Sequence, residues 1–153
     1  MTLKELSILD WTERCKQTSM RPDYVPKEAF SDKTANKLTK AIITFIKLHG
    51  GQAERISNMG RYIDDSKVVS DVLGRTYKIG TGKYIKGSGT NGTADISATI
   101  NGKSVKIEVK IGADRQSEAQ KKYQADIERA GGVYFISKTW EDFLNNYKTI
   151  TRC

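Results

Sequence analysis

The chain has 153 residues, of which 37% are hydrophobic, which suits one compact domain with an apolar core and excludes a disordered chain. Its longest strongly apolar run, residues 41–46, is too short to span a bilayer. The N-terminal segment also lacks the apolar centre of a signal peptide, so a soluble cytoplasmic protein without a membrane partner is expected. The formal net charge of +8 favours an anionic partner, of which nucleic acid is the commonest.

The first part of the chain is predicted to be helical. Residues 1–31 are expected to form an N-terminal arm, in which one short helix fits the spacing of Leu3, Leu6, Ile8 and Trp11. Apolar residues recur at helical spacing over residues 33–49, which predicts a second helix that ends at the glycine pair following it. Ser31 or Asp32 is expected to cap the start of this helix.

A basic, glycine-rich insertion is predicted inside the main domain of residues 32–153. It covers about residues 58–92, follows a strand candidate at residues 52–57, and is expected to contain a hairpin around residues 77–85. Basic side chains neutralise phosphates, glycines let the backbone approach them, and tyrosines can stack on unpaired bases. The insertion is therefore interpreted as a DNA-contacting hairpin, the alternative being a solvated loop. The residues expected to bind DNA are Arg75, Lys78, Lys83 and Lys86, with Arg55 of the strand candidate as a further phosphate contact or a plain surface charge.

A second hairpin is predicted at the Asn101-Gly102 dipeptide, which separates two runs of alternating apolar and polar residues and is the strongest short hairpin signal. A two-residue turn there pairs Ile96 with Ile107 on an apolar face. On the opposite face the same register places Asp95 across from Glu108, with their β-carbons about 4.5–5.5 Å apart.

Two facing carboxylates need a compensating charge, because like charges directly opposite each other destabilise a sheet. Lys110 shares a face with Glu108, since side chains alternate along a strand. Hydrated Mg²⁺ or Mn²⁺ suits two carboxylates with few other ligands, and a neighbouring lysine can orient a water or stabilise charge on a phosphate. The alternative is that Lys106, Glu108 and Lys110 form the solvated face of an edge hairpin.

The C-terminal part is predicted to contain a helix, a strand and a helix. Ser117 and Gln120 have the capping-box spacing and open a helix that ends at the glycine pair 131–132. A short buried strand follows at residues 133–136, and Thr139 is expected to cap a last helix over residues 140–147. Gln120 is either the capping partner of Ser117 or a member of an active site, or it serves one role in each state.

Asp95, then Glu108-Val109-Lys110, then Ser117-x-x-Gln120 and the glycine-led strand after it resemble the PD-(D/E)XK nuclease signature, in particular its virus-type replication-repair (VRR-NUC) branch. The resemblance covers about residues 34–147. It implies an α/β fold with a restriction-endonuclease-like αβββαβ core, a mixed sheet flanked by helices, and metal-dependent cleavage of DNA. It further implies that Asp95, Glu108 and the Val109 carbonyl bind Mg²⁺ or Mn²⁺, that Lys110 positions the attacking water, and that Gln120 lies in the site.

The resemblance also implies a phage-like standalone endonuclease that acts as a homodimer on branched, nicked or junction DNA in a bacterial or phage-infected cell, with no small-molecule cofactor. One departure is that such nucleases often carry a glutamate early in the first helix, whereas residues 33–37 here have no acid. Asn36 is the residue of that segment that could approach the site. The alternatives are a non-cleaving DNA-binding module on the same fold and an RNA-processing nuclease.

Overall fold

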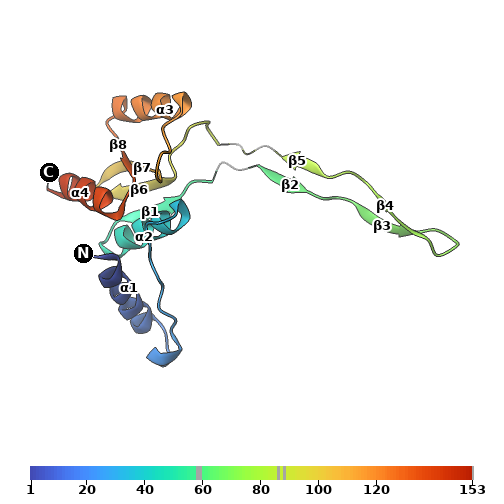
Figure 1. The fold of residues 1–153 in the computed structure, drawn as a ribbon, viewed down its shortest axis with the longest axis horizontal. Coiled ribbons are helices and arrows are strands. Elements are labelled where there is room, and N and C mark those ends of the chain that lie inside the picture. The colour runs from blue at the N-terminus through green and yellow to red at the C-terminus, as the bar shows by residue number, and fades with distance from the viewer. Residues whose placement is uncertain (58–59, 86, 88, 153) are drawn as a thin grey trace. The chain divides into compact units, whose positions relative to one another are not determined.

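Figure 1 shows the computed structural model of the chain, which describes residues 1–57, 60–85, 87 and 89–152. The chain divides into two compact units, Met1–Ile56 with Gly92–Cys153, and Ser57–Asn91. The larger unit combines helices with a mixed sheet, which confirms the predicted α/β class. No helix within the described ranges is long and apolar enough to cross a membrane.

The larger unit contains four α-helices, one 3-10 turn and four strands among its described residues. In chain order they are α1 (Leu3–Gln17), η1 (Pro22–Tyr24), α2 (Ala35–Leu48), β1 (Gln52–Arg55), β6 (Ile96–Ile100), β7 (Lys103–Val109), α3 (Glu118–Arg129), β8 (Val133–Ser137) and α4 (Trp140–Thr151). From α2 onward this is the predicted order of helix, strand, insertion, two strands, helix, strand and helix.

The strands of the larger unit lie in the order β1-β6-β7-β8. β1, β6 and β7 are antiparallel, while β7 and β8 are parallel and are connected through α3. The register predicted from the Asn101-Gly102 turn is confirmed, with Ile96 opposite Ile107. Asn101 and Gly102 have φ angles of 49° and 76°, which is the left-handed conformation that this two-residue turn requires at both positions.

The core lies between one face of this sheet and helices α1, α2 and α4. Alternate residues of β6 and β7 point into it, and α2 covers them with one apolar stripe. Each fully buried isoleucine or leucine contributes about 1.5–3 kcal/mol before the entropy of ordering is subtracted. Figure 1 shows α3 on the other side of the sheet from α2, where it contacts β8. The fully buried aliphatic residues of the core include Leu6, Leu38, Ile42, Ile46, Ile96, Val105 and Ile107.

The start of α2 corrects one prediction about its cap. Thr34, not Ser31 or Asp32, caps the helix by accepting a hydrogen bond from the Lys37 backbone N–H at 3.4 Å. The hydroxyl of Ser31 instead accepts a backbone N–H two residues further on. The carboxylate of Asp32 accepts the backbone N–H of Trp140 at 3.4 Å. Both predicted caps are thus engaged in other contacts, one of them with a distant element that local sequence patterns do not reveal.

The smaller unit is a long two-stranded antiparallel hairpin, here called the ribbon (residues 60–85). β2 pairs with β5 and β3 pairs with β4, and both pairs keep the same register, since Arg61 faces Ile85 and Ser70 faces Thr76. Its strands are β2 (Arg61–Ile63), β3 (Lys67–Ser70), β4 (Thr76–Ile79) and β5 (Lys83–Ile85).

The predicted hairpin around residues 77–85 is wrong, because these residues form the returning strand of the ribbon. The turn lies earlier, at residues 71–75, where Asp71 accepts the backbone N–H groups of Leu73 and Arg75 at 2.8 and 2.9 Å. Gly74 supplies the positive φ of 74° that the turn needs. Asp71 and Gly74 are typical turn residues, but the aliphatic Val72 and Leu73 between them are not, so the sequence pattern did not indicate a turn here.

Candidate active site

The predicted residues Asp95, Glu108 and Lys110 gather at one end of the larger sheet, where β6 begins and β7 ends. Paired residues stop at Ile96, one step before the ladder pair predicted for the two carboxylates. Asp95 Oδ2 instead accepts the backbone N–H of Val109 at 2.9 Å. This bond ties the segment before β6 to the last residue of β7 and holds the Asp95 carboxylate at the site.

Glu108 is only 2% exposed, and Lys110 is 7% exposed. The alternative of a solvated edge face is therefore wrong for these two residues. Glu108 Oε1 accepts hydrogen bonds from Lys110 Nζ, 3.0 Å away, and from Gln120 Nε2. Its other oxygen, Oε2, is buried and has no hydrogen-bond partner among the described residues. A buried acceptor left unpaired costs about 1–3 kcal/mol, so this oxygen marks a position suited to a ligand.

The site holds more carboxylates than cations. Lys110 Nζ also lies 3.5 Å from Asp114 Oδ2. Burial raises the pKa of Glu108, and the negative charges of Asp95 and Asp114 add to this effect against the opposing influence of Lys110. Burial lowers the pKa of Lys110, but its bond to Glu108 and the charges of Glu108 and Asp114 outweigh burial, so the pKa is raised. Burial is thus the main cause of the Glu108 shift, whereas the neighbouring carboxylates cause the Lys110 shift; a cation bound beside these carboxylates would offset their negative charge.

Gln120 completes the predicted capping box and contacts Glu108 at the same time. Its Oε1 accepts the backbone N–H of Ser117 at 2.9 Å, and its own backbone N–H donates to Ser117 Oγ at 3.3 Å, which completes the capping box. Its Nε2 donates at the same time to Glu108 Oε1. The expectation of one role in each state is therefore unnecessary, because the cap holds the amide in the orientation that reaches Glu108.

Gly92 makes the close approach of α3 possible, and sequence reasoning did not single it out. Its φ is +80°, and a β-carbon built on it would lie 2.4 Å from the carbonyl carbon of Ala119 and 2.7 Å from the backbone nitrogen of Gln120. The chain therefore crosses the first turn of α3 at a distance that only glycine permits. A glycine three residues before Asp95 was the available signal.

A second polar cluster, which sequence reasoning also missed, connects α3 to β8. Gln116 Nε2 donates to Gln124 Oε1 at 2.9 Å and to the Tyr134 hydroxyl at 3.3 Å. Burial raises the pKa of Tyr134 to about 12, with smaller contributions from the charges of Glu108 and Asp95. The tyrosine is thus a neutral, buried group on the α3 side of the sheet. The available signal was the pair Gln116 and Gln124, eight residues apart, with Gln116 just before α3 and Gln124 within it.

Arg55 lies at the same end of the sheet, because it pairs with Ile96 in the β1–β6 ladder. Its guanidinium donates to Asn36 Oδ1 at 2.8 Å, and the first turn of α2 has no acidic residue. A pocket of about 300 Å³ opens beside this pair. Asn36 therefore binds the Arg55 guanidinium at the position where nucleases with the resembling motif often carry a glutamate. The residues that line the pocket are Asn36, Thr39, Lys40, Ile43, Thr44 and Arg55.

The predicted DNA contacts of the ribbon differ in how far their charges are already neutralised. Arg75 Nε lies 3.3 Å from Asp71 Oδ2, and Lys78 Nζ lies 2.9 Å from Asp64 Oδ2. Lys83 has no ion pair with any described residue. Lys86, the fourth predicted contact, lies outside the described residues.

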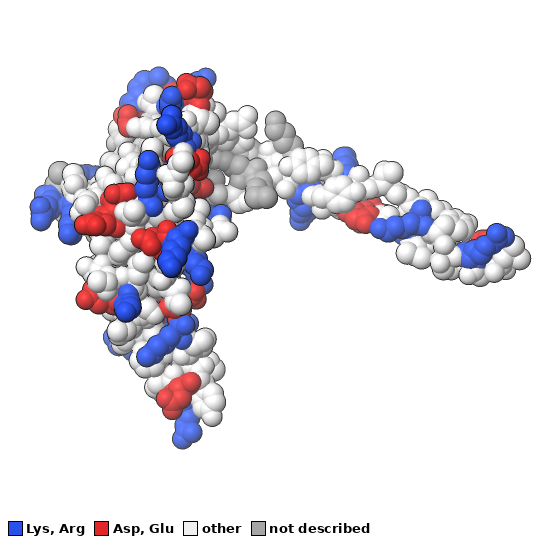
Figure 2. Space-filling model, viewed as in Figure 1, with Lys and Arg blue, Asp and Glu red and all other residues white. Residues whose placement is uncertain are grey.

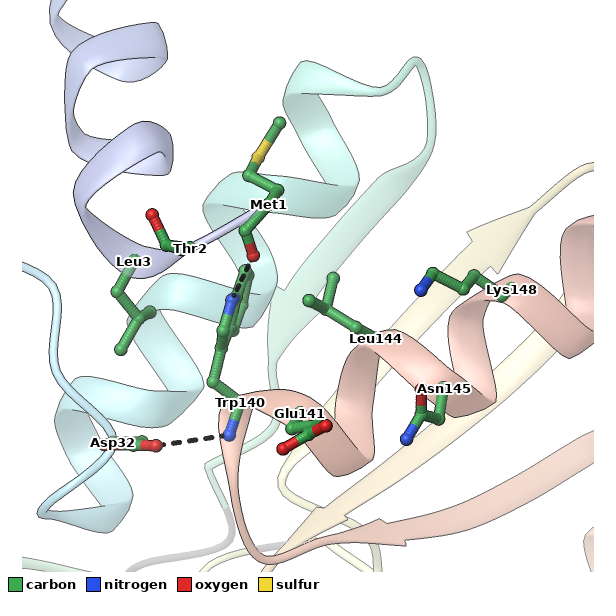
Figure 3. Close-up of a pocket in the computed structure, with 9 residues that line it drawn as sticks. All are labelled: Met1, Thr2, Leu3, Asp32, Trp140, Glu141, Leu144, Asn145 and Lys148. Atoms are coloured by element: carbon green, nitrogen blue, oxygen red, sulfur yellow. Dashed lines mark hydrogen bonds between the residues drawn. The ribbon is translucent and has the colours of Figure 1, made fainter.

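A pocket of about 390 Å³ lies where the N-terminal residues meet α4 (Figure 3). Trp140 Nε1 donates to the Met1 carbonyl at 3.0 Å, and Leu3 and Leu144 lie on opposite sides of the Trp140 side chain. The pocket shares no residue with the carboxylate cluster at the end of β7. It is a junction that holds α1 against α4.

The described residues contain no group of three or more His, Cys, Asp or Glu side chains that could hold a metal ion. A metal bound by Asp95 and Glu108 would thus need backbone and water ligands as well, which is how Mg²⁺ is commonly held. Comparison of the chain with family models, curated proteins and solved structures found no match, so any functional assignment is carried by the arrangement of Asp95, Glu108, Lys110 and Gln120 alone.

Proposed function

We propose that the chain is a Mg²⁺-dependent DNA endonuclease of the PD-(D/E)XK type, with a restriction-endonuclease-like αβββαβ core built from α2, β1, β6, β7, α3 and β8. One observation carries the proposal. Glu108 is buried beside Asp95 with one oxygen held by Lys110 and Gln120, and its other oxygen is buried without a partner among the described residues. A carboxylate so arranged is costly unless a ligand uses the second oxygen.

The donor set fits Mg²⁺ or Mn²⁺. Asp95, Glu108 and the carbonyl of Val109 would hold the ion, with waters completing its coordination. When bound, the ion supplies charge stabilisation at a phosphoryl oxygen and lowers the pKa of a coordinated water. The carboxylates of Glu108 and Asp114 lie 3.0 and 3.5 Å from Lys110 Nζ, and with Asp95 they leave more negative than positive charge at the site, which favours a bound divalent cation.

Lys110 would act as a donor rather than as a base. Its pKa is raised, so the amine stays protonated at neutral pH and can donate hydrogen bonds but cannot accept a proton. Held 3.0 Å from Glu108 Oε1, the ammonium group would orient an attacking water or stabilise charge that develops on a phosphate. Gln120 would keep Glu108 in place from the other side, because its own amide is fixed by the α3 cap.

The second candidate function is a non-cleaving DNA-binding module, and one observation favours it. The first turn of α2 lacks an acid, and Asn36 there holds Arg55 instead. A site with fewer carboxylates binds a cation more weakly, and Arg55, whose described partner is the neutral Asn36 amide, keeps an unneutralised charge that can contact a phosphate.

A homodimer is part of the first proposal, the DNA endonuclease, because two sites related by a two-fold axis match a two-fold substrate such as a four-way junction.

The decisive experiment is a cleavage assay with Mg²⁺, with Mn²⁺ and with EDTA. Substrates are supercoiled plasmid, linear duplex, flap and four-way junction, each also offered in competition with an RNA duplex. Glu108→Gln and Lys110→Ala are expected to lower the cleavage rate by about 100-fold or more. Glu118→Gln is the matched control, because this glutamate on α3 is 89% exposed, and it should cleave like the unmodified chain.

Each outcome separates the candidates. Metal-dependent cleavage that both site variants abolish supports the DNA endonuclease. Tight DNA binding without cleavage in either metal would replace it with the binding module. Faster cleavage of RNA than of DNA would assign the same site to RNA processing, and undiminished cleavage by Glu108→Gln would refute the assignment of the site.

A further inference from the structure

The ribbon exposes apolar side chains that no described part of the chain covers. All residues of β3, β4 and β5 are exposed, and Figure 2 shows mostly uncharged surface between its charged residues. A two-stranded hairpin is marginally stable by itself in water, and exposed aliphatic side chains add to that cost. The ribbon therefore has the features of an element that binds a partner.

Three cations of the ribbon are unpaired within the described residues, and each stands opposite an isoleucine in the ladder. A cation flanked by an aliphatic surface extends its charged end outward, where it can reach a phosphate. A second copy of the ribbon is a poor partner for this surface, because stacking two copies would bring unneutralised cations together. A polyanion fits the same surface. The pairs are Arg61 with Ile85, Lys83 with Ile63, and Lys67 with Ile79.

The base of the ribbon is stiffened by tyrosines that lie across glycines. Tyr62 and Tyr84 face each other across the strands. The hydroxyl of Tyr62 lies 1.6 Å from where a β-carbon on Gly82 would be, and that of Tyr84 lies 2.3 Å from the corresponding point on Gly60. Each ring thus fills the space that glycine leaves open, which orders a pair of strands that has no core of its own.

The tip of the ribbon presents two aliphatic side chains on a locked turn. Val72 and Leu73 are 102% and 71% exposed. The turn beneath them is fixed by Asp71, which accepts two backbone N–H groups and pairs with Arg75. Aliphatic side chains held rigidly at the end of a basic ribbon match the wedges that some proteins insert between base pairs from the minor groove.

We propose that the ribbon lies in the minor groove of a DNA duplex and that Leu73, with Val72, enters the base stack as a wedge. Residues 60–85 contain no Asn or Gln, so the ribbon lacks the amides that read adenine directly. It would instead recognise duplexes that bend easily. The inference rests on the proposed function for the choice of DNA, and it specifies the substrate as DNA whose stacking is already interrupted, as at a nick or junction, where the cost of unstacking is smaller.

The test uses the full chain carrying Glu108→Gln, so that binding is measured without cleavage. The DNA is a duplex with a fluorophore at each end, either intact or with a central nick, and both affinity and end-to-end energy transfer are recorded. The tip variant combines Val72→Ala with Leu73→Ala. Val68→Ala is the matched control, because this valine is 70% exposed but lies on β3 away from the turn. Leu73→Met is the conservative variant.

The tip variant is expected to bind nicked duplex about tenfold more weakly and to lose the bending signal. Its salt dependence should stay unchanged, because no phosphate contact is removed. Val68→Ala and Leu73→Met should bend the duplex like the parent protein. Bending by the tip variant equal to that of the parent protein would overturn the wedge.

The proposed nuclease activity and the proposed wedge can be refuted independently of each other. For cleavage, the chain with Glu108 is compared with and without the tip substitutions. If both cleave nicked and intact duplex equally well and only with a metal ion, the nuclease is supported and the wedge is overturned. Tip-dependent bending without cleavage in any metal would support the wedge and remove the nuclease.

Discussion

Replacement of Gly92 by alanine tests how the site is assembled. Gly92 crosses the first turn of α3 with a φ of +80°, and an added β-carbon would lie 2.4 Å from both the carbonyl carbon and the carbonyl oxygen of Ala119. The nearest atoms belong to the backbone of a helix, so they cannot rotate away as a flexible side chain can. The helix or the crossing segment has to move.

Two costs add up for this substitution. A non-glycine residue in the left-handed region costs about 1–2 kcal/mol, and overpacking against a fixed neighbour costs about 1–3 kcal/mol. Gly92→Ala should therefore lower the free energy of unfolding by about 2–5 kcal/mol. The displaced segment also contacts Gln120, whose amide holds Glu108, so cleavage should fall together with stability.

Gly131→Ala is the matched control, since Gly131 lies at the other end of α3 with a φ of +82° and nothing within 4 Å of its added β-carbon. Its free energy of unfolding should fall only by the conformational cost of about 1–2 kcal/mol, and its cleavage activity should be unchanged. Urea denaturation followed by circular dichroism measures both variants. If Gly92→Ala destabilises the chain no more than Gly131→Ala does, the close crossing beneath α3 is refuted.

Three further predictions concern charge. Mg²⁺ at about ten times its dissociation constant should stabilise the chain by about 1.4 kcal/mol, which is measured as a rise in Tm. Glu108→Gln should abolish this rise, and an equal rise in the variant would mean that the ion binds elsewhere. Because the pKa of Glu108 is raised in the folded state, its protonated form is the stabilising one. Without divalent ions, the unfolding free energy of the unmodified chain relative to Glu108→Gln should therefore fall as pH rises above the ordinary pKa of a glutamate, which is about 4.3, and a constant or rising difference in urea denaturation would contradict this. Lys83→Ala should reduce the slope of log affinity against log salt by about 1, whereas Arg75→Ala should change it less because Asp71 already pairs with Arg75; binding titrations at several salt concentrations decide, and equal changes would argue against the pairing.

Local signals account for the parts of the fold that the sequence predicted well. The Asn101-Gly102 turn set the register of β6 and β7, because two residues with positive φ leave little freedom in the pairing of the flanking strands. The caps at Ser117 and Thr139 marked the starts of α3 and α4 for a similar reason, since each is completed within four residues. The alternation of side-chain direction along β7 and the residue after it predicted that Glu108 and Lys110 share one face.

Contacts between distant segments account for what the sequence did not reveal. The use of Asp32 by Trp140 joins residues far apart in the chain, so the choice of Thr34 as the cap of α2 could not be read locally. The burial of Glu108 depends on α3 lying across the sheet, and that position depends on Gly92. The turn of the ribbon was missed for a different reason, because Val72 and Leu73 resemble core residues in composition while being fully or largely exposed.

The buried Glu108 and the exposed Val72 and Leu73 occupy positions where the stability of the fold alone would favour other residues. At position 108 a well-packed apolar side chain would avoid the desolvation of a carboxylate, since buried ion pairs are often no more stable than apolar replacements. At positions 72 and 73 polar residues would avoid exposing aliphatic surface on a turn that Asp71 already holds. Ile107 on β7 faces the core and supplies the stability that Glu108 beside it does not. Departures from local stability of this kind are expected where a ligand provides the missing contacts, and we propose a different ligand group for each of these two: a cation beside Glu108 and an apolar, stacked surface beyond Leu73.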